Sequence, residues 1–270
     1  MSNKVLEKTL KNVDKEDMNP GWASGQSTAV GSMSIQDQAF NNSGTTAISG
    51  SGTMTVGGSA RAAMVLFAII VATGTWAWVS IPEDKFTLAL FGGIFVGLAF
   101  GLITTFKPKY ARVTAPLYAV AEGVALGAIS KVFEYAYNGI VVQAILATGS
   151  IVFVMYTLYA TGVIKVTQKF RKIVIGATMG VFVFYMLNLV LGLVGVDLPL
   201  IGDTGLLGIV FSLVVIVIAA SNLALDFDFI ERGAQAGLPK YMNWAAGYGL
   251  AVTVVWIYLE VLRLLSKIRN

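Results

Sequence analysis

The sequence contains no cysteine and no histidine, and only 13% of its 270 residues are charged. The absence of cysteine excludes disulfide bonds and thiolate chemistry. The absence of histidine removes the side chain that most often changes charge near neutral pH, binds metals and acts as a general base. Any response of this protein to protons must therefore rely on carboxylic acids.

The low charge goes with a hydrophobic fraction of 56% and a mean hydropathy of +0.74. Soluble domains keep about 25% of their residues charged. Seven apolar stretches each exceed the ~18 residues that a helix needs to cross a bilayer. They cover residues 62–80, 86–106, 113–133, 139–164, 173–195, 205–230 and 241–265. Because the stretches are long and lack the alternation of a membrane barrel, we predict an all-α bundle of seven transmembrane helices.

Residues 1–60 contain no apolar periodic stretch, and residues 41–52 are rich in Ser, Gly, Thr and Asn. Such a composition is typical of flexible linkers. We therefore expect a disordered polar tail over residues 1–60, followed by the transmembrane domain over residues 61–270.

Basic residues gather in the connections after the second and fourth spans, at Lys107, Lys109, Arg112, Lys165, Lys169, Arg171 and Lys172. Because cytoplasmic loops carry excess Lys and Arg, this pattern predicts a cytoplasmic N-terminus and, after seven spans, a C-terminus outside. The basic end at Arg263, Lys267 and Arg269 opposes the second conclusion, so either the last span is unusual or the earlier spans overrule these late charges, and we favour the second explanation. The spread of basic residues between spans fits contact with anionic lipid, and not binding of nucleic acid. We expect an integral membrane protein.

Small residues recur at close-packing intervals in two spans. Gly93, Gly97 and Gly101 are four residues apart in the second span, and Gly123 and Gly127 repeat the spacing in the third. Such stripes let helix backbones approach closely in lipid. We interpret them as packing surfaces, with a ligand site as the alternative.

Ionisable residues inside the spans are few, and Glu122 is the most deeply placed carboxylate. A charge at membrane depth costs roughly 2.5–3.5 kcal/mol, so such groups face the bundle interior, pair or become neutral. Glu122 is therefore either a protonated acid hydrogen-bonded to a neighbouring helix or an ion or proton site. Lys131 and Glu134, nearer the end of the third span, are interpreted as structural.

Asp226 and Asp228 lie two residues apart in the sixth span, about 200° apart around a helix. Both therefore cannot face inward. Asn222 lies one turn before Asp226 on the same face, which favours Asp226 for the interior and as the first candidate site residue. Asp228 is expected to be a solvated acid at the interface, with a supporting role as the alternative.

Glu260 in the seventh span has Arg263 three residues later, so a simple structural ion pair is one reading of this position. The other reading is functional. Two buried carboxylates held close together cannot both ionise cheaply, which gives a route to a proton-gated device without histidine. Carboxylate oxygens are also the ligands that Ca²⁺ prefers, so one site could exchange a proton for a cation.

Three motifs, taken in order, carry a resemblance to a known family. They are Ala121-Glu122-Gly123 in the third span, Leu225-Asp226-Phe227-Asp228 in the sixth, and Tyr258-Leu259-Glu260 with the following apolar, basic end in the seventh. Over residues 60–268 the chain resembles a bacterial member of the Bax inhibitor-1 family, also called the transmembrane Bax inhibitor motif family, and this resemblance implies a location in a bacterial plasma (inner) membrane.

The resemblance implies a bundle whose seventh helix is surrounded by the other six. It also implies that Asp226 and Glu260 form a pair that senses pH for a calcium leak and could bind Ca²⁺. Two features depart from the family pattern: the second acid is Glu, and the two acids are 34 positions apart. Pairing would require the additional residues, around 233–243, to lie outside the bilayer.

Two functions follow as hypotheses. The first is a pH-sensitive cation (Ca²⁺) leak channel gated by Asp226, Glu260 and Glu122, with Asp228, Asn222 and Arg263 in supporting roles. The second is a non-transporting regulator that binds another membrane protein, such as a membrane-anchored protease. We expect no enzyme activity and no cofactor, since a Ser/His dyad is impossible without histidine; lipid, Ca²⁺ and protons are the expected partners.

Overall fold

The computed structural model describes residues 52–195 and 205–270, all within the compact unit Gly50–Asn270. The polar tail predicted for residues 1–60 lies outside the described residues up to residue 51, whereas the first helix already begins at Val56. Seven long helices follow one another along the described chain, and each is long and apolar enough to cross a membrane. They are α3 (Val56–Ser80), α4 (Phe86–Phe106), α5 (Ala111–Ala136), α6 (Ile140–Ala160), α7 (Gln168–Leu193), α9 (Leu206–Gln235) and α10 (Met242–Arg269). The predicted seven-span α-helical bundle is confirmed.

Several helix boundaries follow from local side-chain and backbone chemistry. Thr55 caps α3 by accepting a hydrogen bond from the Gly58 N–H at 2.9 Å, which satisfies one of the free donors of the first turn. Gly139 before α6 and Gly237 after α9 have φ angles of 78° and 64°, which favour glycine. These connections are short, so consecutive helices run antiparallel.

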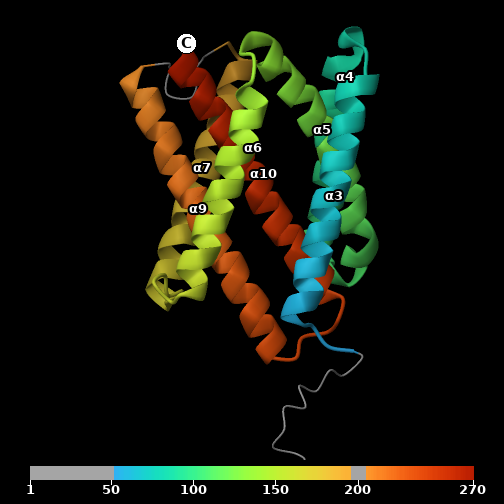
Figure 1. Cartoon of the computed structure of the whole chain (residues 1–270), viewed down its shortest axis with the longest axis vertical. Helices are drawn as coiled ribbons and strands as arrows, with labels where there is room; N and C mark the ends of the chain where they lie inside the picture. Colours follow the sequence, from blue (N-terminus) through green and yellow to red (C-terminus); the bar gives the residue numbers. More distant parts are fainter. Residues whose placement is uncertain (1–51, 196–204) are drawn as a thin grey trace, which may run out of the picture. The chain divides into compact units, whose positions relative to one another are not determined.

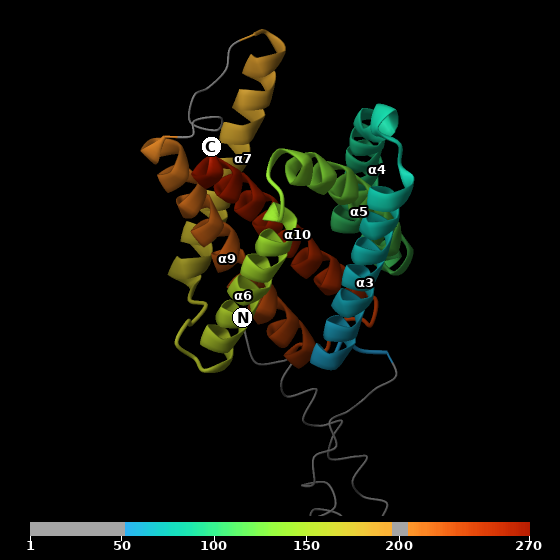
Figure 2. The same cartoon turned by 45° about the horizontal axis from the view of Figure 1, so that its top comes forward.

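Helix α10 lies in the middle of the bundle, between two groups of helices (Figures 1 and 2). In the first group, α5 packs against α3 and α4. In the second, α9 packs against α6 and α7. The backbone of α10 passes close to the backbones of α3, α4, α5, α6 and α9. It is linked to α7 by a hydrogen bond from the Tyr185 hydroxyl to Glu260. The expectation that the last span is central is therefore confirmed.

The two larger clusters of the buried core lie on opposite sides of α10, and a smaller third cluster contains Met54, Ile230 and Ala246. Ile257 and Leu262 of α10 pack against Leu223 of α9 and Ile140 of α6. On the other side, Ala251 and Val255 of α10 pack with residues of α3 and α5, among them Leu66 and Ala119. Because α10 contributes to both larger clusters, it holds the two groups of helices together.

The glycine stripes are used inside the molecule. A Cβ atom at Gly93 would lie 2.7 Å from the carbonyl oxygen of Ala121 on α5. On α5, Gly123 and Gly127 meet the backbone of α3 so closely that any side chain would overlap the carbonyl oxygens of Ile70 and Gly74. The interpretation of these stripes as packing surfaces is confirmed.

Candidate functional site

Asp226 lies on α9 and faces α10. Its Oδ2 atom accepts a hydrogen bond from the Thr253 hydroxyl at 2.6 Å, and its other oxygen lies beside Gly249, one turn before Thr253. The residue is half-buried. Within residues 52–195 and 205–270, no Lys or Arg side chain pairs with this carboxylate. Asp226 therefore faces the interior, as the sequence predicted, without a compensating positive charge.

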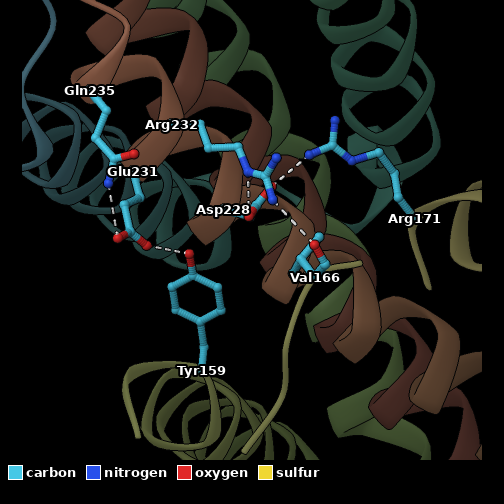
Figure 3. A network of polar contacts seen from close by, with 7 residues as sticks. All are labelled: Tyr159, Val166, Arg171, Asp228, Glu231, Arg232 and Gln235. Carbon is cyan, nitrogen blue, oxygen red and sulfur yellow. Dashed lines mark hydrogen bonds and ion pairs between the residues drawn. The ribbon is translucent and has the colours of Figure 1, made fainter. Parts of the chain in front are cut away.

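Asp228, two residues further along α9, has a different environment (Figure 3). Its Oδ2 atom lies 2.6 Å from Nη2 of Arg171 on α7, and its Oδ1 atom lies 2.8 Å from Nε of Arg232. Arg232 also donates a hydrogen bond from Nη2 to the Val166 carbonyl oxygen at 3.2 Å. Asp228 is only 5% exposed, so the expectation of a solvated interfacial acid is wrong. Its role is to join α7, α9 and the connection before α7.

A cavity of about 510 Å³ lies beside this ion-paired cluster. Tyr159, Lys165, Asp228, Glu231 and Arg232 are among its lining residues. The Tyr159 hydroxyl donates to Glu231 at 2.5 Å, as Figure 3 shows. The cavity carries acidic and basic groups in similar number, so its charges are largely balanced among themselves.

Glu260 lies on α10 and is 1% exposed. Its Oε1 atom accepts hydrogen bonds from Arg263 at 2.6 Å and from the Tyr185 hydroxyl of α7 at 2.8 Å. Arg263 also donates to the Tyr185 oxygen and stacks 5.1 Å above its ring centroid. The Oε2 atom of Glu260 has no hydrogen-bond partner among the described residues. These contacts agree with the interpretation of Glu260 and Arg263 as a structural ion pair.

The structure does not bring Asp226 and Glu260 together. Asp226 contacts Thr253, and Glu260 lies seven residues further along α10, which corresponds to about 10 Å of helix rise. Helix α9 continues to Gln235 and α10 begins at Met242, so only residues 236–241 form the turn between them. Too few residues are left outside the helices to shift the register. The implied acid pair, with its tentative Ca²⁺ site, is therefore not formed, and the described residues hold no cluster of three potential metal ligands.

Glu122 lies on α5 and is half-buried. Its Oε2 atom lies against Gly97 of α4, and Gly101, one turn further on α4, lies against the hydroxyl of Tyr248 of α10. Among the described residues, no donor forms a hydrogen bond to Glu122. The alternative of a neutral acid hydrogen-bonded to a neighbouring helix is therefore not what this structure shows.

The Asn222 amide does not donate a hydrogen bond to Asp226, although the two residues lie one turn apart on α9. Its amide donates to the Thr178 hydroxyl of α7 at 2.8 Å and to the Ile218 carbonyl oxygen at 2.9 Å. Lys131 and Glu134 form structural contacts, as expected. Lys131 donates to the Trp78 carbonyl oxygen, and Glu134 accepts from the Gly139 and Val141 N–H groups at the start of α6.

The four acids among the candidate site residues thus divide into two kinds. Asp228 and Glu260 are paired with arginine, whereas Asp226 and Glu122 lack a positive partner in the described part of the chain. Sequence reasoning missed Thr253 as the partner of Asp226. Gly249 and Thr253 lie four residues apart and therefore share one face of α10. This spacing of two small residues is the signal that could have indicated a face packed against α9.

Comparison with known proteins gives one match of the chain to a family. The model of the family described as Bax inhibitor 1 like matches residues 8–270. Neither the curated proteins nor the solved structures give a match.

Proposed function

The chain belongs to the Bax inhibitor 1 like family, and from this premise we propose that it is a pH-sensitive cation leak in a membrane, with Ca²⁺ as the permeant ion. One observation carries the proposal: Asp226 faces the central helix with a single hydrogen bond from Thr253 and no compensating positive charge among the described residues.

The cost of a charge at membrane depth supports this choice of residue. Insertion of an isolated acid costs roughly 2.5–3.5 kcal/mol, and a positive partner offsets that cost. Arginine supplies this compensation to Asp228 and Glu260. For Asp226, a cation moving through the bundle would supply it instead. Carboxylate oxygens are suitable ligands for a hard cation such as Ca²⁺.

Glu122 is the second candidate site acid without a positive partner among the described residues, and it lies on the opposite group of helices. Its contact with Gly97 lies one turn of α4 from the contact between Gly101 and Tyr248. Tyr248 precedes Gly249, which lies beside Asp226. The two acids therefore flank the same part of α10, which supports a path for cations along this helix.

The proposed pH response follows from the charge of Asp226. The groups that α10 presents to it, Gly249 and Thr253, are uncharged, so ionisation of Asp226 decides whether the site attracts a cation. We therefore expect flux to fall as pH falls. We further propose that the protein acts without an enzyme activity or cofactor. Its proposed location is a plasma membrane, with the N-terminus on the cytoplasmic side as the loop charges predict.

Calcium flux into proteoliposomes that contain a fluorescent Ca²⁺ indicator tests the proposal. Asp226→Asn should reduce the flux about tenfold, equivalent to roughly 1.4 kcal/mol in the barrier, and should abolish its pH dependence. Glu122→Gln should give a smaller reduction. The matched control is Asp84→Asn, which removes an exposed carboxylate outside the long helices and should leave the flux unchanged.

Wild-type flux that is independent of pH and unaffected by Asp226→Asn would overturn the channel proposal. That result would favour the hypothesis of a non-transporting regulator that binds another membrane protein, although no feature of the described residues specifically supports it. The glycine stripe of α4, which could have served as a docking surface, is occupied by α5 and α10.

A further inference from the structure

We propose that Met54 is a plug that closes one end of the α9–α10 interface directly below Asp226, and that residues 52–55, here called the strap, hold it in place. The regulatory meaning of this plug rests on the proposed leak, whereas its control of access to Asp226 does not.

The strap is fixed to the turn between α9 and α10. The Met54 N–H donates to the Leu238 carbonyl oxygen at 2.6 Å, and the Lys240 N–H donates to the Gly52 carbonyl oxygen at 2.9 Å. These two bonds form an antiparallel bridge between Thr53 and Pro239. Figures 1 and 2 show the start of α3 beside the end of α9 and the start of α10.

A side chain of α10 completes this attachment. The Asn243 Oδ1 atom accepts a hydrogen bond from the Thr55 N–H at 3.0 Å and another from the Ser59 hydroxyl at 3.1 Å. Asn243 is buried, so the bonds are sheltered from water. The strap therefore has a defined position before α3 begins.

This attachment inserts Met54 between the two helices. Its side chain is 2% exposed and packs with Ile230 of α9 and Ala246 of α10. Its sulfur atom lies so close to Gly233 that a Cβ atom there would approach it to 2.8 Å. The lack of a side chain at Gly233 is what leaves room for Met54.

The contacts of Met54 lie one helical turn from those of Asp226. Ile230 is four residues after Asp226 on α9, and Ala246 is three residues before Gly249 on α10, so each pair shares a helix face. Met54 therefore fills the space between these faces on the side of Asp226 that leads to the helix ends. The apolar Met54 side chain between α9 and α10 would keep water and ions from reaching the Asp226 carboxylate from these helix ends.

The strap is a four-residue segment outside the helices, and its attachment includes the bridge to the α9–α10 turn, the bond from Thr55 to Asn243 and the packing of Met54. Short segments of this kind open locally at a lower free energy than packed helices do. Methionine is flexible and leaves or re-enters an irregular gap easily. Movement of the strap would thus uncover Asp226 without rearrangement of the helices.

The absence of cysteine provides a direct test, because an introduced cysteine is the only thiol in the protein. Gly249→Cys places this thiol beside Asp226, where a Cβ atom would make only an ordinary contact, at 3.6 Å. The rate of its modification by a charged, water-soluble methanethiosulfonate is measured in lipid nanodiscs. In the Gly249→Cys background, Met54→Ala should raise the rate at least tenfold, whereas Met54→Leu should keep it slow.

Two further variants make the result decisive. Ile140→Ala removes a fully buried side chain at the start of α6, so it reports the effect of a cavity away from the strap and should leave the rate slow. Gly233→Ala should displace Met54 by its added methyl group and raise the rate even if Met54→Ala fails to fold. Equal rates in all folded variants would overturn the plug.

Flux measurements separate this inference from the function on which it rests. If Met54→Ala exposes the thiol but no variant conducts Ca²⁺, the leak proposal fails and the plug stands. If Asp226→Asn changes the flux but Met54→Ala does not change the modification rate, the leak stands and the plug fails. If both hold, Met54→Ala should also raise the Ca²⁺ flux.

Discussion

At the scale of single residues, the acids of this bundle differ in what compensates their charge. Asp228 holds two arginines, although their side chains are 39% and 55% exposed, so the cluster joins helix ends more than it stabilises the core. Glu260 is 1% exposed and depends on one arginine. The role of an acid in this bundle therefore depends more on the partner that the fold places beside it than on its position in the sequence.

The dependence of Glu260 on Arg263 can be measured. Arg263→Leu leaves a buried carboxylate with Tyr185 as its remaining hydrogen-bond donor, which should lower the free energy of unfolding by about 3 kcal/mol. The double variant Glu260→Gln, Arg263→Leu removes the charge but keeps an acceptor for Tyr185, so it should recover most of the loss. Thermal unfolding in detergent gives both values. A double variant that is no more stable than Arg263→Leu would contradict this account.

At the scale of helices, close backbone contact between α3 and α5 replaces the hydrophobic attraction that is missing between helices in lipid. Gly123 and Gly127 of α5 lie one turn apart and face the backbone of α3 around Ile70 and Gly74. The contacts leave no space for a methyl group. The positions of the two glycines therefore set the distance between these helices.

This contact gives a prediction for substitutions of glycine by alanine. Gly127→Ala should force α3 and α5 apart and cost about 1–3 kcal/mol, the typical cost of overpacking. Gly92→Ala is the matched control, because nothing lies within 4 Å of a Cβ atom at that position of α4. The control should be neutral or slightly stabilising, since alanine favours helices. Equal melting temperatures for the two variants would show that the α3–α5 contact does not limit stability.

At the scale of the whole described unit, the start of α3 and the end of α10 lie at opposite ends of the bundle (Figure 1). The strap before α3 is bonded to the α9–α10 turn, whereas Arg269 donates to the Asn138 carbonyl oxygen in the α5–α6 turn. Lys267 is buried and donates to the Gly208 carbonyl oxygen and the Ser212 hydroxyl of α9. Both basic residues thus bond to groups near the start of α9 or in the α5–α6 turn.

Topology reporters can test this arrangement in cells. We expect a fluorescent protein fused to the N-terminus to be active in the cytoplasm, because the basic connections after α4 and α6 predict that side. Alkaline phosphatase fused after residue 270 should be active outside, because the number of spans is odd. Reporters that give the same side for both ends would contradict the seven-span topology.

The sequence predicts much of the fold because hydropathy directly indicates how long each apolar helix is and which residues lie deep in the membrane. The expected stretch at 86–106 agrees with α4, whereas α3 begins six residues before its expected start at 62. That extension has no hydropathy signal, because Thr55 and two glycines begin the helix through capping. The register between α9 and α10 also could not be predicted from hydropathy, because it depends on contacts between side chains that are far apart in the sequence.

The candidate site was therefore predicted in part. Depth and spacing identified Asp226 as facing α10, and Glu122, which is half-buried, as lying between helices. Local spacing also identified Glu260 with Arg263. The pairing of Asp228 with Arg171 joins residues 57 positions apart, and no periodic pattern within one helix could have indicated it.

The central position of α10 has a consequence for the order in which the protein is made. The ribosome synthesises α10 after the six other long helices of the described residues, yet all three core clusters contain its residues. Until α10 enters the membrane, the two groups of helices share only the smaller contacts of α5 with α6 and of α3 with α9, and Asp226 lacks the hydrogen bond from Thr253. We therefore expect assembly to begin from two loosely associated halves, which lipid or the membrane insertion machinery shelters until translation supplies α10.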